Sequence, residues 1–209
     1  MPLYIPPAFA GDEQDVAAIL GDNPLAMLVT PGEGEPWISH VVVQPDPDNA
    51  ACLLGHLASA NPHAQAMLVS DSTLVLQGAH GYVSPAWYVS GLPLVPTWNY
   101  RVAHLTGRAE QVADEALDAL LAQLVSRFEG KEGWRMTAVP EKALAAMRRG
   151  IVGFRFRPQR VEVKNKLSQN RLPEDVVGVM TALTQEGSPE SLRLAAAMRE
   201  ALKPGRRGG

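Results

Sequence analysis

The sequence has little of what disulfide-bonded, exported or membrane proteins need. It contains one cysteine, Cys52, so an internal disulfide is excluded, and the apolar run 51–54 around it favours a small buried side chain. No apolar run approaches the roughly 18 residues of a membrane-spanning helix. The N-terminal residues lack the basic start and apolar stretch of a secretory signal. These absences predict a cytoplasmic protein that does not enter the membrane.

Several local signatures of chemistry are also missing. The five histidines show no metal-binding helical spacing and there is no Cys-x-x-Cys, so we expect no metal site. The Gly-x-Ser-x-Gly elbow of hydrolases and the Gly-x-Gly-x-x-Gly turn of dinucleotide-binding folds are absent. With 22 acidic and 19 basic residues the net charge is −3, and no helix-turn-helix pairing is evident. DNA binding is left open but is not favoured by this charge.

What is present is the pattern of a globular α+β protein. Hydrophobic residues make up 46% and charged residues 20% of the chain. We expect a main domain over 1–185, followed over 186–209 by a C-terminal helix and a flexible tail. Apolar periodicity predicts helices over 12–20, 62–67, 113–128, 140–149, 174–183 and 189–202, and strands over 25–30, 37–43, 51–56, 73–77, 81–84, 98–106 and 150–163. About six strands without β-α-β alternation favour an antiparallel barrel.

Glycines mark the expected ends of some of these elements. Gly21 is expected to close the first helix. Gly78 is expected to interrupt the strand region 73–84, and Gly107 to end the strand over 98–106.

Three segments carry polar or aromatic groups suited to a ligand. Residues 164–171 offer ammonium, hydroxyl, amide and guanidinium groups for an anion, although a solvated loop or a helix cap is the alternative. In 55–63, Ser59 and Asn61 precede a helix and either face an anion or act as caps. The region 82–100 gathers aromatic residues, which suit a flat conjugated ring but equally a dimer interface or a core.

Together these segments resemble the PaiB family, described as FMN-binding negative transcriptional regulators. The resemblance spans about residues 3 to 185 and keeps the family's order and spacing. The segments that carry it are Tyr4-Ile5-Pro6 through Phe9, Gly55-His56-Leu57-Ala58, Ala60-Asn61-Pro62, Tyr82-Val83-Ser84-Pro85, Trp87-Tyr88, Val95-Pro96-Thr97-Trp98-Asn99-Tyr100 and Lys166-Leu167-Ser168-Gln169-Asn170-Arg171.

The resemblance implies a six-stranded split β-barrel of the pyridoxamine-phosphate-oxidase type with peripheral helices. It implies a homodimer that holds FMN in a groove between the subunits. It places His40 and His56 on strands beside the flavin ring. The other cofactor-binding residues that it implies, for the phosphate, the ribityl chain or the groove, are Ser59, Asn61, Trp98, Asn99, Lys166, Ser168, Gln169, Asn170 and Arg171.

The chain departs from the family pattern at three places. His40-Val41-Val42-Val43 stands where His-Leu-Pro-Phe is expected, Ser59 stands for an arginine, and His63-Ala64 stands for Gln-Trp. An arginine can hold a phosphate through two hydrogen bonds, so the change at Ser59 bears on the affinity for flavin.

Two further functions stay open beside that of an FMN-binding regulator. One is an FMN-dependent oxidoreductase, for which Tyr82, His40 and His104 are acid or base candidates without an assigned role. The other is a dimeric module that has lost flavin and binds another small ligand such as heme. The catalytic residues are therefore unknown, and any regulation is expected to be indirect, because the charge does not favour DNA.

Overall fold

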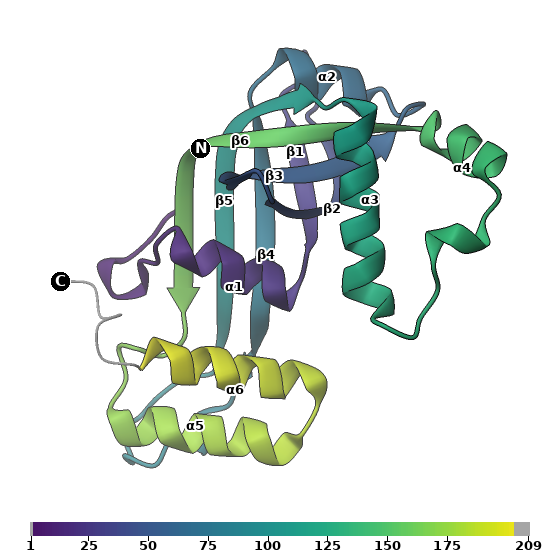
Figure 1. The fold of residues 1–209 in the computed structure, drawn as a ribbon. Helices are drawn as coiled ribbons and strands as arrows, with labels where there is room; N and C mark the ends of the chain where they lie inside the picture. The colour runs from purple at the N-terminus through teal and green to yellow at the C-terminus, as the bar shows by residue number, and fades with distance from the viewer. Residues whose placement is uncertain (1, 203–209) are drawn as a thin grey trace. The chain divides into compact units, whose positions relative to one another are not determined.

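The computed structural model describes residues 2–202. The tail expected to be flexible, 203–209, lies outside them. The order of strands and helices along the chain shows no regular β-α-β alternation (Figure 1). The strands are β1 Leu25–Thr30, β2 Trp37–Asp46, β3 Asn49–Ala58, β4 Ser72–Val83, β5 Thr97–Gln111 and β6 Ile151–Lys166. The helices are α1 Gln14–Asp22, α2 His63–Val69, α3 Asp114–Glu129, α4 Glu141–Arg148, α5 Pro173–Glu186 and α6 Pro189–Ala201, with short 3-10 turns at Pro7–Phe9, Pro85–Trp87 and Met136–Ala138.

The six strands form a closed antiparallel barrel in the order β1-β2-β3-β6-β5-β4. In the β1–β2 hairpin Leu25 pairs with Val42, and Thr30 pairs with Trp37. Strand β3 continues the sheet to β6, where Leu53 pairs with Phe156. This arrangement confirms the predicted α+β split-barrel class.

The chain divides into two compact units. The first contains residues 2–24, 75–104 and 161–202, and the second contains 25–74 and 105–160. Strands β4, β5 and β6 each pass from one unit to the other. The predicted division at residue 185 stays a prediction.

The second unit contains the β1–β2–β3 strands with α2, α3 and α4. Alternate residues of β1 point inward, so Ala26, Leu28 and Thr30 are buried while Leu25 and Met27 are exposed. Leu54 of β3 packs with Leu117 and Leu120 of α3. One end of this sheet face is therefore covered by a helix.

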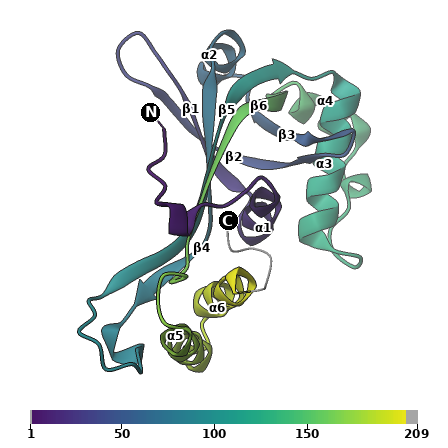
Figure 2. The same ribbon diagram turned by 90° about the vertical axis from the view of Figure 1, so that its left-hand side faces the viewer.

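The first unit is built around α5 and α6, which lie side by side in both views (Figures 1 and 2). Their buried faces, which include Val179 and Leu194, share one hydrophobic cluster with Val83 and Leu167. Gly187 ends α5 in the left-handed conformation with φ of 72°, which a glycine adopts without strain. Within residues 2–202, no helix has both the length and the apolar character needed to cross a membrane.

Three expected glycine boundaries were wrong. Helix α1 continues one residue beyond Gly21, to Asp22. Strand β4 runs through Gly78, where a Cβ atom would lie 3.0 Å from Asp22 Oδ2, and β5 runs through Gly107, where a Cβ atom would lie 2.0 Å from the carbonyl oxygen of Arg157. Both strand glycines allow a close approach of neighbouring atoms and do not break the strand.

Candidate functional site

A pocket opens in the second unit at the place where β2 and β3 stop pairing. The paired residues of these strands extend from Asp46–Asn49 to Val43–Gly55. Beyond that pair, residues 38–42 of β2 and 56–58 of β3 line a pocket of about 560 Å³. Its other lining residues are Leu25, Asn61 and Ile151. The volume lies within the roughly 300–1,000 Å³ that is usual for small-molecule sites.

The pocket wall combines apolar side chains with a few polar ones. Leu25 and Ile38 are 47% and 55% exposed, although both are large and apolar. Four polar residues, Ser39, His40, His56 and Asn61, line the same pocket. The predicted residues His40, His56 and Asn61 are thus brought together, and an apolar wall with a few polar groups suits a flat organic ligand.

His56 carries the clearest unmet hydrogen-bonding group of this pocket. Its Nδ1 atom is buried and has no hydrogen-bond partner within residues 2–202. Burial lowers the pKa of His56 below its ordinary value of 6.5, so the neutral imidazole is favoured. A buried polar atom without a partner is unfavourable, so His56 is held here at a cost in stability.

Asn61 and Ser39 belong to a hydrogen-bonded group. The Asn61 amide donates to Ser39 Oγ over 3.1 Å, and the Asn61 Oδ1 atom accepts the backbone N–H of His63 over 3.0 Å. The His63 side chain continues this group inward and stacks on Trp37, with ring centroids 6.3 Å apart. Asn61 therefore forms the turn that leads into α2 and lines the pocket, but the N-cap residue of α2 is Pro62, so Asn61 is not the predicted helix cap. Its contact with an anion stays a prediction.

Ser59 lies one residue beyond the pocket wall. Its backbone N–H donates to the carbonyl of Gly150 over 2.8 Å, and its hydroxyl donates to the carbonyl of Arg149 over 3.3 Å. The preceding pair, Ala58 and Ile151, lines the pocket. Ser59 thus marks the rim, and its role in cofactor binding stays a prediction.

The other predicted residues lie in the first unit and bind mostly one another. Asn99 Nδ2 donates to Ser168 Oγ over 2.9 Å, and both side chains are buried. Lys166 Nζ donates to the Trp98 carbonyl over 2.7 Å and to the Thr97 hydroxyl. Burial lowers the pKa of Lys166, although the nearby Tyr100 opposes this change.

The rest of the segment after β6 forms a tight turn. Ser168 has a φ of 67°, which is rare for a residue other than glycine. The Gln169 side chain accepts the Leu167 N–H over 2.7 Å and donates to the Asn165 carbonyl. The Arg171 guanidinium lies 5.7 Å from the Tyr88 ring centroid, and Asn170 is exposed. The cofactor roles of these residues stay predictions.

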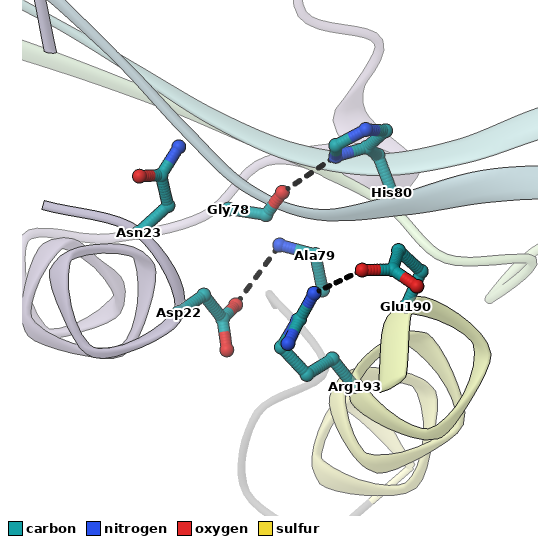
Figure 3. Close-up of a pocket in the computed structure, with 7 residues that line it drawn as sticks. All are labelled: Asp22, Asn23, Gly78, Ala79, His80, Glu190 and Arg193. Atoms are coloured by element: carbon teal, nitrogen blue, oxygen red, sulfur yellow. Dashed lines mark hydrogen bonds and ion pairs between the residues drawn. The ribbon is translucent and has the colours of Figure 1, made fainter. Parts of the chain in front are cut away.

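The first unit also has a smaller pocket of about 230 Å³ between α1, β4 and α6 (Figure 3). Asp22 Oδ2 accepts the Ala79 N–H over 2.9 Å, and Glu190 pairs with Arg193 over 2.9 Å. The Nδ1–H group of His80 donates to the Gly78 carbonyl over 2.9 Å. Because these polar groups already bind one another, this pocket is a weaker candidate than the one between β2 and β3.

Several lining residues were not among those predicted from the sequence. Ser39 lines the pocket beside His40, although adjacent residues of a strand point to opposite faces, so strand alternation does not predict it. His63 was noted only as a departure from the family pattern. Leu25, Ile38 and Ile151 read as ordinary strand residues, and only the parting of β2 and β3 makes them part of a wall.

Comparison with known proteins agrees with the resemblance. Residues 3–160 match the family model described as "Putative FMN-binding domain". The protein named "Protease synthase and sporulation protein PAI 2", from Bacillus subtilis, is 29% identical over 96% of this chain and 99% of its own length. The uncharacterized protein AN0679 of Emericella nidulans is 25% identical over 87% of this chain and 90% of its own length.

Solved structures share the fold. The flavocytochrome Anf3 of Azotobacter vinelandii matches 74% of this chain and 67% of its own, with a TM-score of 0.57 and 24% identity. The FAD and heme binding protein of Mycobacterium smegmatis matches 76% of this chain and 73% of its own, with a TM-score of 0.57 and 20% identity. At these identities the likeness concerns the fold alone.

Proposed function

Because the chain belongs to the family of FMN-binding domains that its residues 3–160 match, we propose that FMN binds in the pocket between β2 and β3 of a homodimer whose role is regulatory. The observation that carries the proposal is the meeting of His40, His56 and Asn61 in one apolar-walled pocket. FMN is the cofactor of the family, and its flavin supplies redox chemistry when bound.

The residues of the pocket fit a flavin. Apolar side chains such as Leu25, Ile38 and Ile151 suit the faces of a conjugated ring. The unpaired His56 Nδ1 and the polar groups of Ser39 and Asn61 suit its polar atoms. Among the described residues 2–202, none that lines this pocket is a lysine or an arginine, so we expect a phosphate to need a cation from the rim or from a partner subunit.

The exposed apolar side chains of β1 and β2 support a homodimer. Leu25, Met27 and Ile38 are between 36% and 55% exposed, and they lie on the same face of two paired strands, because Ile38 pairs with Val29. An exposed apolar patch of this kind is typical of a protein interface. A second copy would cover the patch and place the interface beside the pocket, as expected for FMN held between subunits.

The regulatory role is supported by the Bacillus subtilis relative, whose name links it to protease synthesis and sporulation. The net charge of −3 disfavours direct attraction to DNA. We propose that this regulation is indirect, through a partner or through flavin-dependent metabolism. We also propose that it takes place in the cytoplasm.

An absorbance spectrum tests the proposal. The purified protein is mixed with excess FMN and desalted, and its absorbance spectrum and its molar mass in solution are measured. The expected result is a flavin band retained on a dimer. Loss of all FMN on desalting contradicts it. Reduction of the bound flavin by NADH or NADPH would favour the oxidoreductase alternative.

Heme is the second candidate ligand, because two histidines line the pocket and histidine is a common axial ligand of heme iron. A heme absorption band that persists in His56→Ala and in His40→Ala would exclude both histidines as ligands. Its loss in one of them, with FMN not retained, would favour heme over flavin.

A further inference from the structure

Four side chains form a continuous row of hydrogen bonds that begins inside the second unit and ends at the pocket. Ser72 Oγ lies 2.7 Å from Thr30 Oγ1, and Thr30 Oγ1 lies 2.7 Å from His63 Nε2. His63 Nδ1 lies 2.8 Å from Ser39 Oγ. Ser72, Thr30 and His63 are all at most 1% exposed, whereas Ser39 lines the pocket.

The orientation of Asn61 fixes one end of this row. Its Oδ1 accepts the backbone N–H of His63, so its Nδ2 is the group that faces Ser39 and donates to it. One lone pair of Ser39 Oγ is therefore always occupied. The remaining lone pair and the hydroxyl proton of Ser39 are shared between His63 and the pocket.

The neutral imidazole of His63 allows two directions for the protons in the row. In one, Ser39 donates to Nδ1, Nε2–H donates to Thr30, Thr30 donates to Ser72, and the hydroxyl proton of Ser72 is left over. In the other, Ser72 donates to Thr30, Thr30 donates to Nε2, Nδ1–H donates to Ser39, and the hydroxyl proton of Ser39 is left over.

The surroundings of the two ends decide between these directions. Within residues 2–202, Ser72 Oγ has Thr30 as its one hydrogen-bond partner, so a proton left over there would be buried without an acceptor. Such a group is unfavourable. A proton left over on Ser39 lies at the pocket wall, where a ligand or solvent accepts it.

We propose that His63, protonated on Nδ1, is a positioning residue that sets the Ser39 hydroxyl as a hydrogen-bond donor to the ligand of this pocket. The ligand group that Ser39 selects is then an acceptor, namely an oxygen or an unprotonated nitrogen. The ligand part of the proposal rests on the proposed function, whereas the tautomer of His63 is a property of the ligand-free chain.

The tautomer is tested directly by nitrogen-15 NMR of the full chain without FMN, at a pH where histidine is neutral. Long-range correlations between ring protons and nitrogens separate the two tautomers, and the His63→Gln variant assigns the signals by their loss. The expected result is a proton on Nδ1 of His63. A proton on Nε2 would overturn the proposal.

The donor role is tested by FMN titration of two matched variants that each remove one hydroxyl. Ser39→Ala is expected to weaken FMN binding by about tenfold, the range of one hydrogen bond, because the donor is lost. Ser72→Ala, at the far end of the row, is expected to change binding less than about twofold, because Thr30 still donates to His63. Equal effects of the two variants would overturn the donor role.

Riboflavin, which lacks the phosphate, identifies the accepting group. An equal loss for riboflavin and FMN in Ser39→Ala assigns the donor to the ring or the ribityl chain, and a loss for FMN alone assigns it to the phosphate. If the unmodified protein takes up no FMN, the proposed function fails, and the NMR result still decides the tautomer of His63.

Discussion

The hydroxyl of Ser59 donates a hydrogen bond to the backbone carbonyl of Arg149 at the rim of the pocket. The chain therefore brings an arginine backbone beside the position where the family pattern expects an arginine side chain. The adjacent Arg148 pairs with Asp118, whereas Arg149 is exposed. Within residues 2–202 no lysine or arginine lines the pocket, so we expect positions 59 and 149 at its rim to affect how a bound phosphate is neutralised.

Ser59→Arg is expected to strengthen FMN binding by about tenfold, since a charge-assisted hydrogen bond to phosphate is among the stronger ones. Arg149→Ala is expected to weaken it by a similar factor. Both are measured by quenching of flavin fluorescence, with riboflavin as the ligand without phosphate. Ser126→Arg adds the same charge at an exposed position of α3 and is the control. Parallel changes for FMN and riboflavin would contradict this prediction.

Ile38→Glu is expected to convert the proposed homodimer into a monomer. Ile38 is 55% exposed on β2, and covering a carboxylate there without a partner would be unfavourable by several kcal/mol. Light scattering after gel filtration gives the mass. Leu192→Glu on α6 makes the same change at a residue that is 46% exposed, and it is expected to leave the dimer intact. A dimeric Ile38→Glu protein would move the interface elsewhere.

Acidification is expected to destabilise the protein through His56 and His63. Burial lowers the pKa of both below 6.5, so below about pH 6.5 the unfolded chain binds protons that the folded chain does not. The free energy of unfolding should be constant above that pH and fall below it. Urea unfolding from pH 8 to 5.5 measures this. His63→Gln should flatten part of the slope, and an unchanged slope would exclude His63 as a source.

Asp175→Asn is expected to loosen the segment after β4. The Asp175 carboxylate accepts the N–H groups of Val89 and Ser90 over 2.8 and 2.9 Å and the Ser90 hydroxyl over 2.8 Å. Burial alone would raise the pKa of Asp175. The hydrogen bonds from Ser90 and Val89 lower it by more than burial raises it, so its pKa lies below the ordinary 3.8. Its stabilising effect is present above that value and is lost as the pH falls through the lowered pKa.

Hydrogen exchange at the Val89 and Ser90 amides, together with thermal unfolding, measures the effect of Asp175→Asn. Faster exchange and a lower midpoint are expected. Glu174→Gln neutralises the exposed neighbouring carboxylate and is the control, for which no change is expected. Similar changes in both variants would mean that charge, and not the hydrogen bonds to this segment, is responsible.

The sequence predicted most elements because their periodicity and flanking turns agree. The hairpin over 25–30 and 37–43 corresponds to β1 and most of β2, and the helix over 113–128 corresponds to α3 within one residue. The predicted breaks at Gly78 and Gly107 were wrong because a glycine that ends a strand and a glycine that admits a neighbouring atom look the same in a single sequence.

The candidate site was predictable only in part. His40, His56 and Asn61 come from the family resemblance, and all three line the same pocket, while their binding of a cofactor stays a prediction. The role proposed for Ser39 depends on the row of hydrogen bonds that runs through His63. The residues of this row are distant from one another in the sequence. Asn99 and Ser168 form a hydrogen bond although 69 positions separate them in the sequence, so no local pattern predicts this contact.

The chain passes between its two compact units after residues 24, 74, 104 and 160. Neither unit is therefore encoded by one continuous stretch of the gene, so neither can be gained, lost or exchanged by a single recombination event. A truncation at any of these points removes segments from both units or leaves one incomplete.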